Sequence, residues 1–159
     1  MDISSYRDQV TARLTDHDYE TLSVADANPF EPVWYKKDED PTIGVTKVYV
    51  TVIEDADIDT DRLATTAEAF RTLLSSSAPQ TAGSIENLFG YVVFAVDNPS
   101  ESLIEFATEE YTVANRRTNV FPLLYDLSSE RLYTHTVPRL KGRGFYEKQK
   151  LDADALLTP

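Results

Sequence analysis

The stretch that most constrains the fold runs from residue 91 to residue 137. It contains two apolar runs, residues 91–96 and 120–125, and an aspartate follows each run directly. Between the runs, apolar residues recur at the spacing of one helical face. A strand, a helix and a strand of these lengths form a βαβ unit, in which the strands are parallel and the crossover is right-handed. The sequence therefore predicts this unit at the centre of a sheet.

The predicted crossover helix has a defined start. Asn98 has the side chain of an N-cap, Pro99 suits the first helical position, and Glu101 can return to the cap. After the second strand, residues 127–131 have the composition of a turn. Residues 132–137 then alternate like a strand and predict a hairpin partner.

Other segments supply further elements on both sides of this unit. We expect a helix over residues 4–21, strands over 31–37 and 45–53 in an antiparallel hairpin, a helix over 59–75 and a short helix over 147–157. The fold class is therefore α+β or α/β. It comprises one mixed sheet of about five strands with a central βαβ unit, terminal hairpins and helices packed on the sheet.

The chain is long enough for one core, and residues 1–159 are expected to form a single globular domain. The spacing of apolar residues also selects the side chains that should be buried. The expected core includes Val48, Val50, Leu63, Phe70, Leu74, Val93, Phe94, Leu103 and Leu123.

Composition excludes several classes of protein. There are no cysteines, so disulfides and thiolate metal sites are ruled out. No apolar run approaches the ~20 residues of a membrane span. The first residues lack the basic and apolar regions of a signal peptide. We therefore expect a cytoplasmic protein without a membrane partner.

The chain is strongly acidic, with a formal net charge of −12. Such a surface is typical of proteins that work in molar salt, where the repulsion between carboxylates is screened. An ordinary acidic protein is the alternative interpretation.

The charge is unevenly distributed along the chain. Residues 116–150 hold eight basic and three acidic residues, a net charge of +5, whereas the other residues carry −17. Such a segment could bind an anion, dock on the protein's own acidic surface or contact a partner. The cations and aromatics expected to make contacts are Arg116, Arg117, Arg139, Lys141, Arg143, Phe145 and Tyr146.

Two groups of acidic residues are candidates for a chemical site. Asp97 and Asp126 end the two central strands, so parallel pairing would bring both carboxylates to one sheet edge, where they could hold Mg²⁺ or share acid–base work. Either aspartate is also an ordinary turn former, and we favour that role. The acidic run at residues 54–61 departs from the EF-hand pattern, with Thr60 where glycine is required.

Glu20, Glu31 and Lys36 are the only candidates for the motif of a PD-(D/E)XK nuclease. The Glu-x-Lys pair that should follow an aspartate on a strand is missing. No hydrolase, dinucleotide or phosphate-loop motif occurs. We therefore expect no catalytic residue, no metal site and no cofactor.

The apolar run at residues 120–127, followed by Leu132 and Tyr133 and by residues 141–146, resembles the C-terminal half of small haloarchaeal α/β proteins. The resemblance covers roughly the last seventy residues and implies no activity. The first half, a helix followed by a hairpin, is similar in architecture to tail-terminator and neck proteins of tailed viruses.

These observations favour a non-enzymatic structural or accessory protein of a halophilic archaeon or its virus, located in the cytoplasm or the virion. Its expected partner is another protein or further copies of itself. The alternative is a nucleic-acid-binding or degenerate nuclease-like protein that uses the basic C-terminal loop and the Asp97/Asp126 edge.

Overall fold

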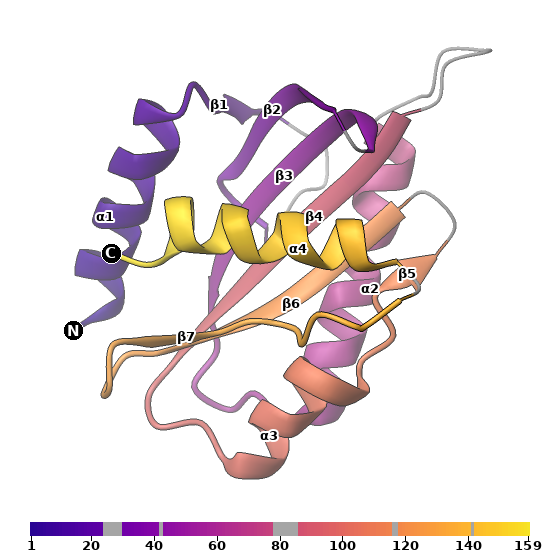
Figure 1. Ribbon diagram of the computed structural model, residues 1–159. Helices are drawn as coiled ribbons and strands as arrows, with labels where there is room; N and C mark the ends of the chain where they lie inside the picture. The colour runs from indigo at the N-terminus through magenta and orange to yellow at the C-terminus, as the bar shows by residue number, and fades with distance from the viewer. Residues whose placement is uncertain (24–29, 42, 78–85, 116–117, 141) are drawn as a thin grey trace.

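The computed structural model describes residues 1–23, 30–41, 43–77, 86–115, 118–140 and 142–159 (Figure 1). Its helices and strands are α1 (Ile3–Asp16), β1 (Glu20–Leu22), β2 (Val33–Asp40), β3 (Gly44–Glu54), α2 (Thr60–Ser77), β4 (Glu86–Val96), α3 (Glu101–Glu105), β5 (Ala114–Asn115), β6 (Thr118–Asp126), β7 (Arg131–Tyr133) and α4 (Arg143–Asp152). Two helices continue into π-helical segments, α3 into η1 (Phe106–Glu110) and α4 into η2 (Ala153–Leu157).

All the strands form one mixed sheet in the order β1-β2-β3-β4-β6-β5, with β7 also paired to β6. Strands β3, β4 and β6 are parallel, and the other pairings are antiparallel. The central βαβ unit is confirmed, as are the β2–β3 and β6–β7 hairpins. Because β4 occupies one edge of β6 along its length, β5 and β7 share the other edge at opposite ends.

The sheet thus has six strand positions, and the prediction of about five was too low. The missed strands are β1 and β5, which have three and two residues. Strands this short show no alternation of apolar and polar residues from which they could be predicted.

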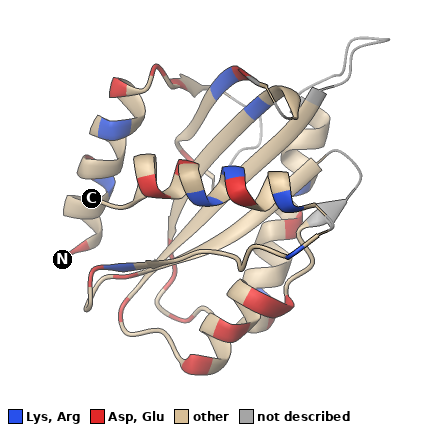
Figure 2. Cartoon of the chain, viewed as in Figure 1, with Lys and Arg blue, Asp and Glu red and all other residues tan. Residues whose placement is uncertain are grey.

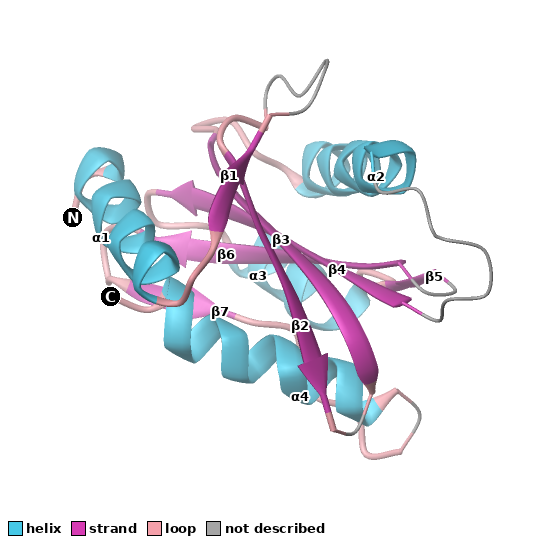
Figure 3. Cartoon of the chain, turned by 90° about the horizontal axis from the view of Figure 1, so that it is seen from above, coloured by secondary structure: helices cyan, strands magenta, loops and turns pink. Residues whose placement is uncertain are grey.

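Helices cover both faces of the sheet (Figure 3). The crossovers β3–α2–β4 and β4–α3–β6 run in the same direction across parallel strands, so right-handed connections place α2 and α3 on one face. Helices α1 and α4 lie on the other, where Tyr6 stacks on Tyr125 with ring centroids 3.9 Å apart and Phe145 lies 5.7 Å from Phe89. We call these the α2 face and the α4 face.

Gly90 sets how closely α2 approaches β4. A Cβ atom at this position would lie 2.8 Å from Leu74 Cδ1 and 3.0 Å from Phe70 Cε2. The absence of a side chain lets the two α2 side chains rest directly on the backbone of the central strand. Successive strand residues point to opposite faces, so the neighbouring Phe89 projects to the α4 face.

All nine predicted core residues are buried, with no more than 3% of any of them exposed. The central strands β4 and β6 are buried on both faces from Leu88 to Val96 and from Asn119 to Asp126. This explains why they appear in the sequence as continuous apolar runs and not as alternating ones.

Several predicted boundaries were wrong. The first helix ends at Asp16 because the chain turns through a left-handed Asp18 (φ 66°) and then pairs with β2. The strand expected over residues 31–37 runs further, since Asp38–Asp40 still pair with β3. The last strand ends at Tyr133, and α4 begins at Arg143 instead of Glu147, so much of the predicted basic loop is helical.

The predicted N-cap at Asn98 was also wrong. Asn98 adopts a left-handed conformation (φ 52°), which asparagine tolerates, and the cap of α3 is Ser100, whose Oγ accepts the N–H of Leu103 at 3.2 Å. In α1, Ser5 is already helical and donates its N–H to Asp2 Oδ1 at 2.7 Å.

Phe70 provides the sharpest test of the core. It is fully buried, lies 5.0 Å from Phe30 and rests on Gly90. Phe70→Ala should lower the free energy of unfolding by about 3–5 kcal/mol, because the strand beneath it cannot move into the cavity. Thr65→Ser is the control, since Thr65 is exposed on the same helix and should change stability by less than about 0.5 kcal/mol. Urea unfolding of both variants measures the free energy of unfolding. Similar losses in the two variants would contradict this packing of Phe70.

Candidate contact surface

The sheet edge predicted from Asp97 and Asp126 exists. Asp126 ends β6 opposite Val96, the last residue of β4, and Asp97 follows directly. Asp126 Oδ1 accepts the N–H groups of Asn98 at 3.0 Å and Ser128 at 2.9 Å, and its Oδ2 accepts the hydroxyl of Ser129 at 2.8 Å. Asp97 accepts the hydroxyl of Ser128. The carboxylates of Asp97 and Asp126 thus hold the loops that follow β4 and β6 in place through hydrogen bonds.

These hydrogen bonds alter the acidity of Asp126. Burial acts to raise the pKa of its carboxyl, but hydrogen bonds from Ser129, Asn98 and Ser128 favour the charged form and hold the pKa below its ordinary value. Asp126 therefore stabilises the fold as a carboxylate.

Acidic residues in the run at residues 54–61 also have local structural roles. Asp55 pairs with Arg62 at 2.7 Å, and Asp59 accepts the N–H of Arg62 at 2.8 Å at the start of α2. Within the described ranges, no group of three or more His, Asp or Glu side chains is placed to hold a metal ion.

The contribution of Asp126 should depend on pH. Its folded pKa is depressed, so the stability it adds is fully present above the unfolded pKa of about 3.9 and is lost as pH falls through the folded value. Asp126→Asn should cost about 1–3 kcal/mol at pH 7, with a difference that shrinks below about pH 4. Urea titrations at several pH values measure this, with the exposed Asp57→Asn as control. A difference that persists unchanged at low pH would contradict the assignment.

The basic segment leads into α4, whose inner side is built into the core. Phe145 contacts Phe89, and the ring of Tyr146 meets Phe121 edge-on at 5.4 Å. Gly142 precedes the helix with φ +75°, a left-handed turn that aims α4 across the sheet. The two aromatics predicted as contact residues are thus partly buried inside the protein.

Gln149 fixes α4 to the chain that follows β7. Its side chain is fully buried, and its Oε1 accepts the N–H of His135 at 2.7 Å. Its Nε2 donates to the carbonyls of Tyr146 at 2.8 Å and His135 at 3.3 Å. His135, one of the two histidines, is itself buried and lies 3.0 Å through Nε2 from the carbonyl of Tyr111.

A polar cluster anchors the end of α4. The hydroxyl of Tyr91 donates to Asp152 Oδ2 at 2.6 Å, and Lys148 Nζ lies 3.2 Å from the same oxygen. Burial raises the pKa of Asp152 above its ordinary value, while Lys148 and Tyr91 oppose that shift. The helix then continues into η2, which α1 holds through the Tyr6 hydroxyl on the Leu157 carbonyl at 2.9 Å.

The opposite side of α4 faces solvent (Figure 2). Leu140, just before the helix, is 88% exposed, and Leu151 near its end is 70% exposed. With Met1 they are the exposed large apolar residues in the described part of the chain. We define the α4 outer face as Arg139, Leu140, Arg143, Lys150 and Leu151, all of which are exposed.

The seven residues predicted to make contacts thus have different outcomes. Arg139 and Arg143 lie on the α4 outer face, although Arg143 also pairs with Glu147 at 2.6 Å. Phe145 and Tyr146 point inward. Arg116, Arg117 and Lys141 lie outside the described residues. Sequence reasoning missed Leu140 and Leu151. The signal for Leu151 was an apolar side chain on the charged side of a helix, and the signal for Leu140 was an apolar side chain between basic residues.

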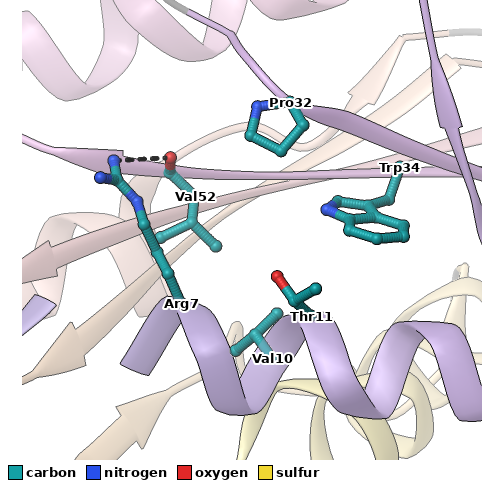
Figure 4. Close-up of a pocket in the computed structure, with 6 residues that line it drawn as sticks. All are labelled: Arg7, Val10, Thr11, Pro32, Trp34 and Val52. Carbon is teal, nitrogen blue, oxygen red and sulfur yellow. Dashed lines mark hydrogen bonds between the residues drawn. The ribbon is translucent and has the colours of Figure 1, made fainter. Parts of the chain in front are cut away.

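A second surface feature lies between α1 and strands β2 and β3 (Figure 4). Here a cavity of about 70 Å³ is lined by Arg7, Val10, Thr11, Pro32, Trp34 and Val52. Its volume is well below the roughly 300–1,000 Å³ of a pocket for a drug-sized ligand. We call it the Trp34 pocket.

Comparisons with protein-family models, curated proteins and solved structures returned no match. Over the ranges that the structure describes, no helix has the length and apolarity needed to cross a membrane.

Proposed function

We propose that this protein is a non-enzymatic component of a larger assembly and that it acts through protein–protein contacts made by the α4 outer face. The observation that carries the proposal is the exposure of Leu140 and Leu151, 88% and 70%, on a segment whose inner side is firmly held. Leu140 precedes α4 and Leu151 lies on it, and a partner could cover both side chains without disturbing the packing of the inner side.

The energetics favour a contact surface. Burying one exposed leucine side chain is worth roughly 1.5–3 kcal/mol, so two supply a useful apolar centre. Arginine is enriched in interfaces, because its guanidinium pairs with carboxylates and its stem packs on apolar groups. Arg139 and Arg143 flank Leu140 in the sequence and are exposed beside it.

The rest of the molecule supplies the complementary charge. Four exposed glutamates lie on α3 and η1, at the lower end of the view in Figure 2: Glu101, Glu105, Glu109 and Glu110. A partner with a similar acidic surface would attract the arginines. In molar salt the Debye length is about 3 Å, so such attraction acts only through direct ion pairs.

The acidic composition and the resemblances noted in the sequence support a halophilic setting, either archaeal or viral. We therefore place the protein in the cytoplasm or the virion of such a system, with its partner another subunit of the same assembly. In this setting apolar contacts matter most, because salt does not weaken them.

Replacing the cations tests the contact surface. The double variant Arg139→Glu with Arg143→Glu, used as bait in molar KCl, should capture at most half as much of the native partner from a lysate of the source cells as wild-type protein does. The reason is that two attractive ion pairs become repulsive. The matched control is Arg62→Glu with Arg131→Glu, which makes the same change in net charge away from α4. Thermal melts verify that both variants fold. Unchanged capture by the first variant, or capture of DNA in place of protein, would contradict the proposal.

A halophilic origin has its own test. With −17 of charge outside residues 116–150, repulsion between carboxylates should destabilise the fold in dilute buffer and be screened in molar KCl. We expect the melting temperature to rise by about 4–12 °C between the two conditions, as a stability difference of about 2–3 kcal/mol would produce. Equal melting temperatures would count against this origin.

A further inference from the structure

We propose that the partner of the α4 outer face is a second copy of this protein. Leu151 of one copy inserts into the Trp34 pocket of the next, and Asp154 of the first copy pairs with Arg7 of the second. The proposal rests on the proposed function, since it names the partner for the same surface.

The Trp34 pocket has the shape and walls to receive an aliphatic side chain. Val10, Pro32, Trp34 and Val52 give it apolar sides, with α1 below and strands β2 and β3 above (Figure 4). About 70 Å³ suits one branched side chain and is too small for most metabolites. Trp34 is only partly buried, and packing against an inserted side chain would cover its ring.

Arg7 stands at this pocket with most of its hydrogen-bonding capacity unused. Its Nη2 donates to the carbonyl of Val52 at 3.4 Å, a long contact, and its guanidinium has no other partner among the residues described. A guanidinium has five N–H donors in a planar fork that fits a carboxylate. The pocket therefore suits an apolar side chain with an acidic group beside it.

Leu151 and Asp154 have that combination. Both line one shallow hollow on the outside of α4, together with Glu147 and Lys150. Glu147 is already paired with Arg143, whereas the carboxylate of Asp154 makes no ion pair or hydrogen bond within the described part of the chain. Leu140 is also exposed, but it precedes the helix and has no free carboxylate one helical turn away.

The two features lie on different elements, the pocket on α1, β2 and β3 and the leucine on α4. Such a contact can be reciprocal across a two-fold axis, which gives a dimer with two Leu151–pocket contacts, or heterologous, which leaves a free leucine and a free pocket and builds a ring or filament. In either case Leu151 of each copy is covered by the pocket of another.

Charge reversal provides the direct test. Arg7→Glu and Asp154→Arg should each weaken self-association in molar KCl by about tenfold, because like charges then meet across the contact. The double variant carrying both changes restores an ion pair and should recover association to within about threefold of wild type. Sedimentation velocity over a concentration series measures this.

Trp34 gives an independent readout, because it is the only tryptophan in the chain. Its emission should shift to shorter wavelength as wild-type protein is concentrated and should stay constant in Leu151→Ser. Thr11→Phe fills the pocket from the exposed side of α1 without removing a side-chain contact and should also abolish association.

Failure of this inference differs from failure of the proposed function. If Leu151→Ser abolishes association but Arg7→Glu and Thr11→Phe leave it unchanged, the α4 outer face is a contact surface and the Trp34 pocket is not its partner. Wild-type protein that remains monomeric at all concentrations while still capturing a different protein through the α4 outer face would also overturn the inference. If neither association nor capture responds to Leu151→Ser, both proposals are wrong.

Discussion

The burial of β4 and β6 on both faces is the constraint on which the rest of the structure depends. Two adjacent parallel strands that are apolar throughout cannot leave either face in water, so the chain must cover both. Helix α2 covers one face and fits closely because Gly90 has no side chain. The other face receives α1 and α4, of which α4 comes from the far end of the chain. The C-terminal helix is therefore part of the core and not an appendage.

This origin of α4 accounts for its two different sides. The inner side combines aromatic packing with buried polar anchors, of which Gln149 and Asp152 are the most specific. A helix held by such hydrogen bonds has a fixed rotation about its axis. The orientation of Leu151 toward solvent is thus imposed by the anchors, and the leucine cannot turn inward without breaking them. An outward-facing apolar side chain on a rigid helix is well suited to binding, since little backbone conformational entropy is lost when it is covered.

Much of the fold was predictable because its strongest signals are local. The apolar runs of β4 and β6 and the stripe of Leu63, Phe70 and Leu74 on α2 each identify an element without knowledge of its neighbours. The misplaced caps show the limit of such reasoning. Asn98 and Ser100 have equivalent capping chemistry, and only the left-handed backbone at Asn98 distinguishes them. The candidate contact surface was harder to predict from the sequence. Arginines in the basic segment could be recognised, but the exposure of Leu151 and the apposition of Arg7 and Trp34 follow from tertiary packing.

The central claim is that the α4 outer face is covered by protein when this chain functions. The absence of cysteines makes a direct measurement possible, because one introduced thiol is unique. Leu151→Cys should react with a maleimide rapidly in dilute, dissociated protein and at least about tenfold more slowly in the assembled state in molar KCl, as burial of the site requires. Thr65→Cys, exposed on α2, should react equally fast in both. Equal reactivity of Leu151→Cys in the two states would contradict the account.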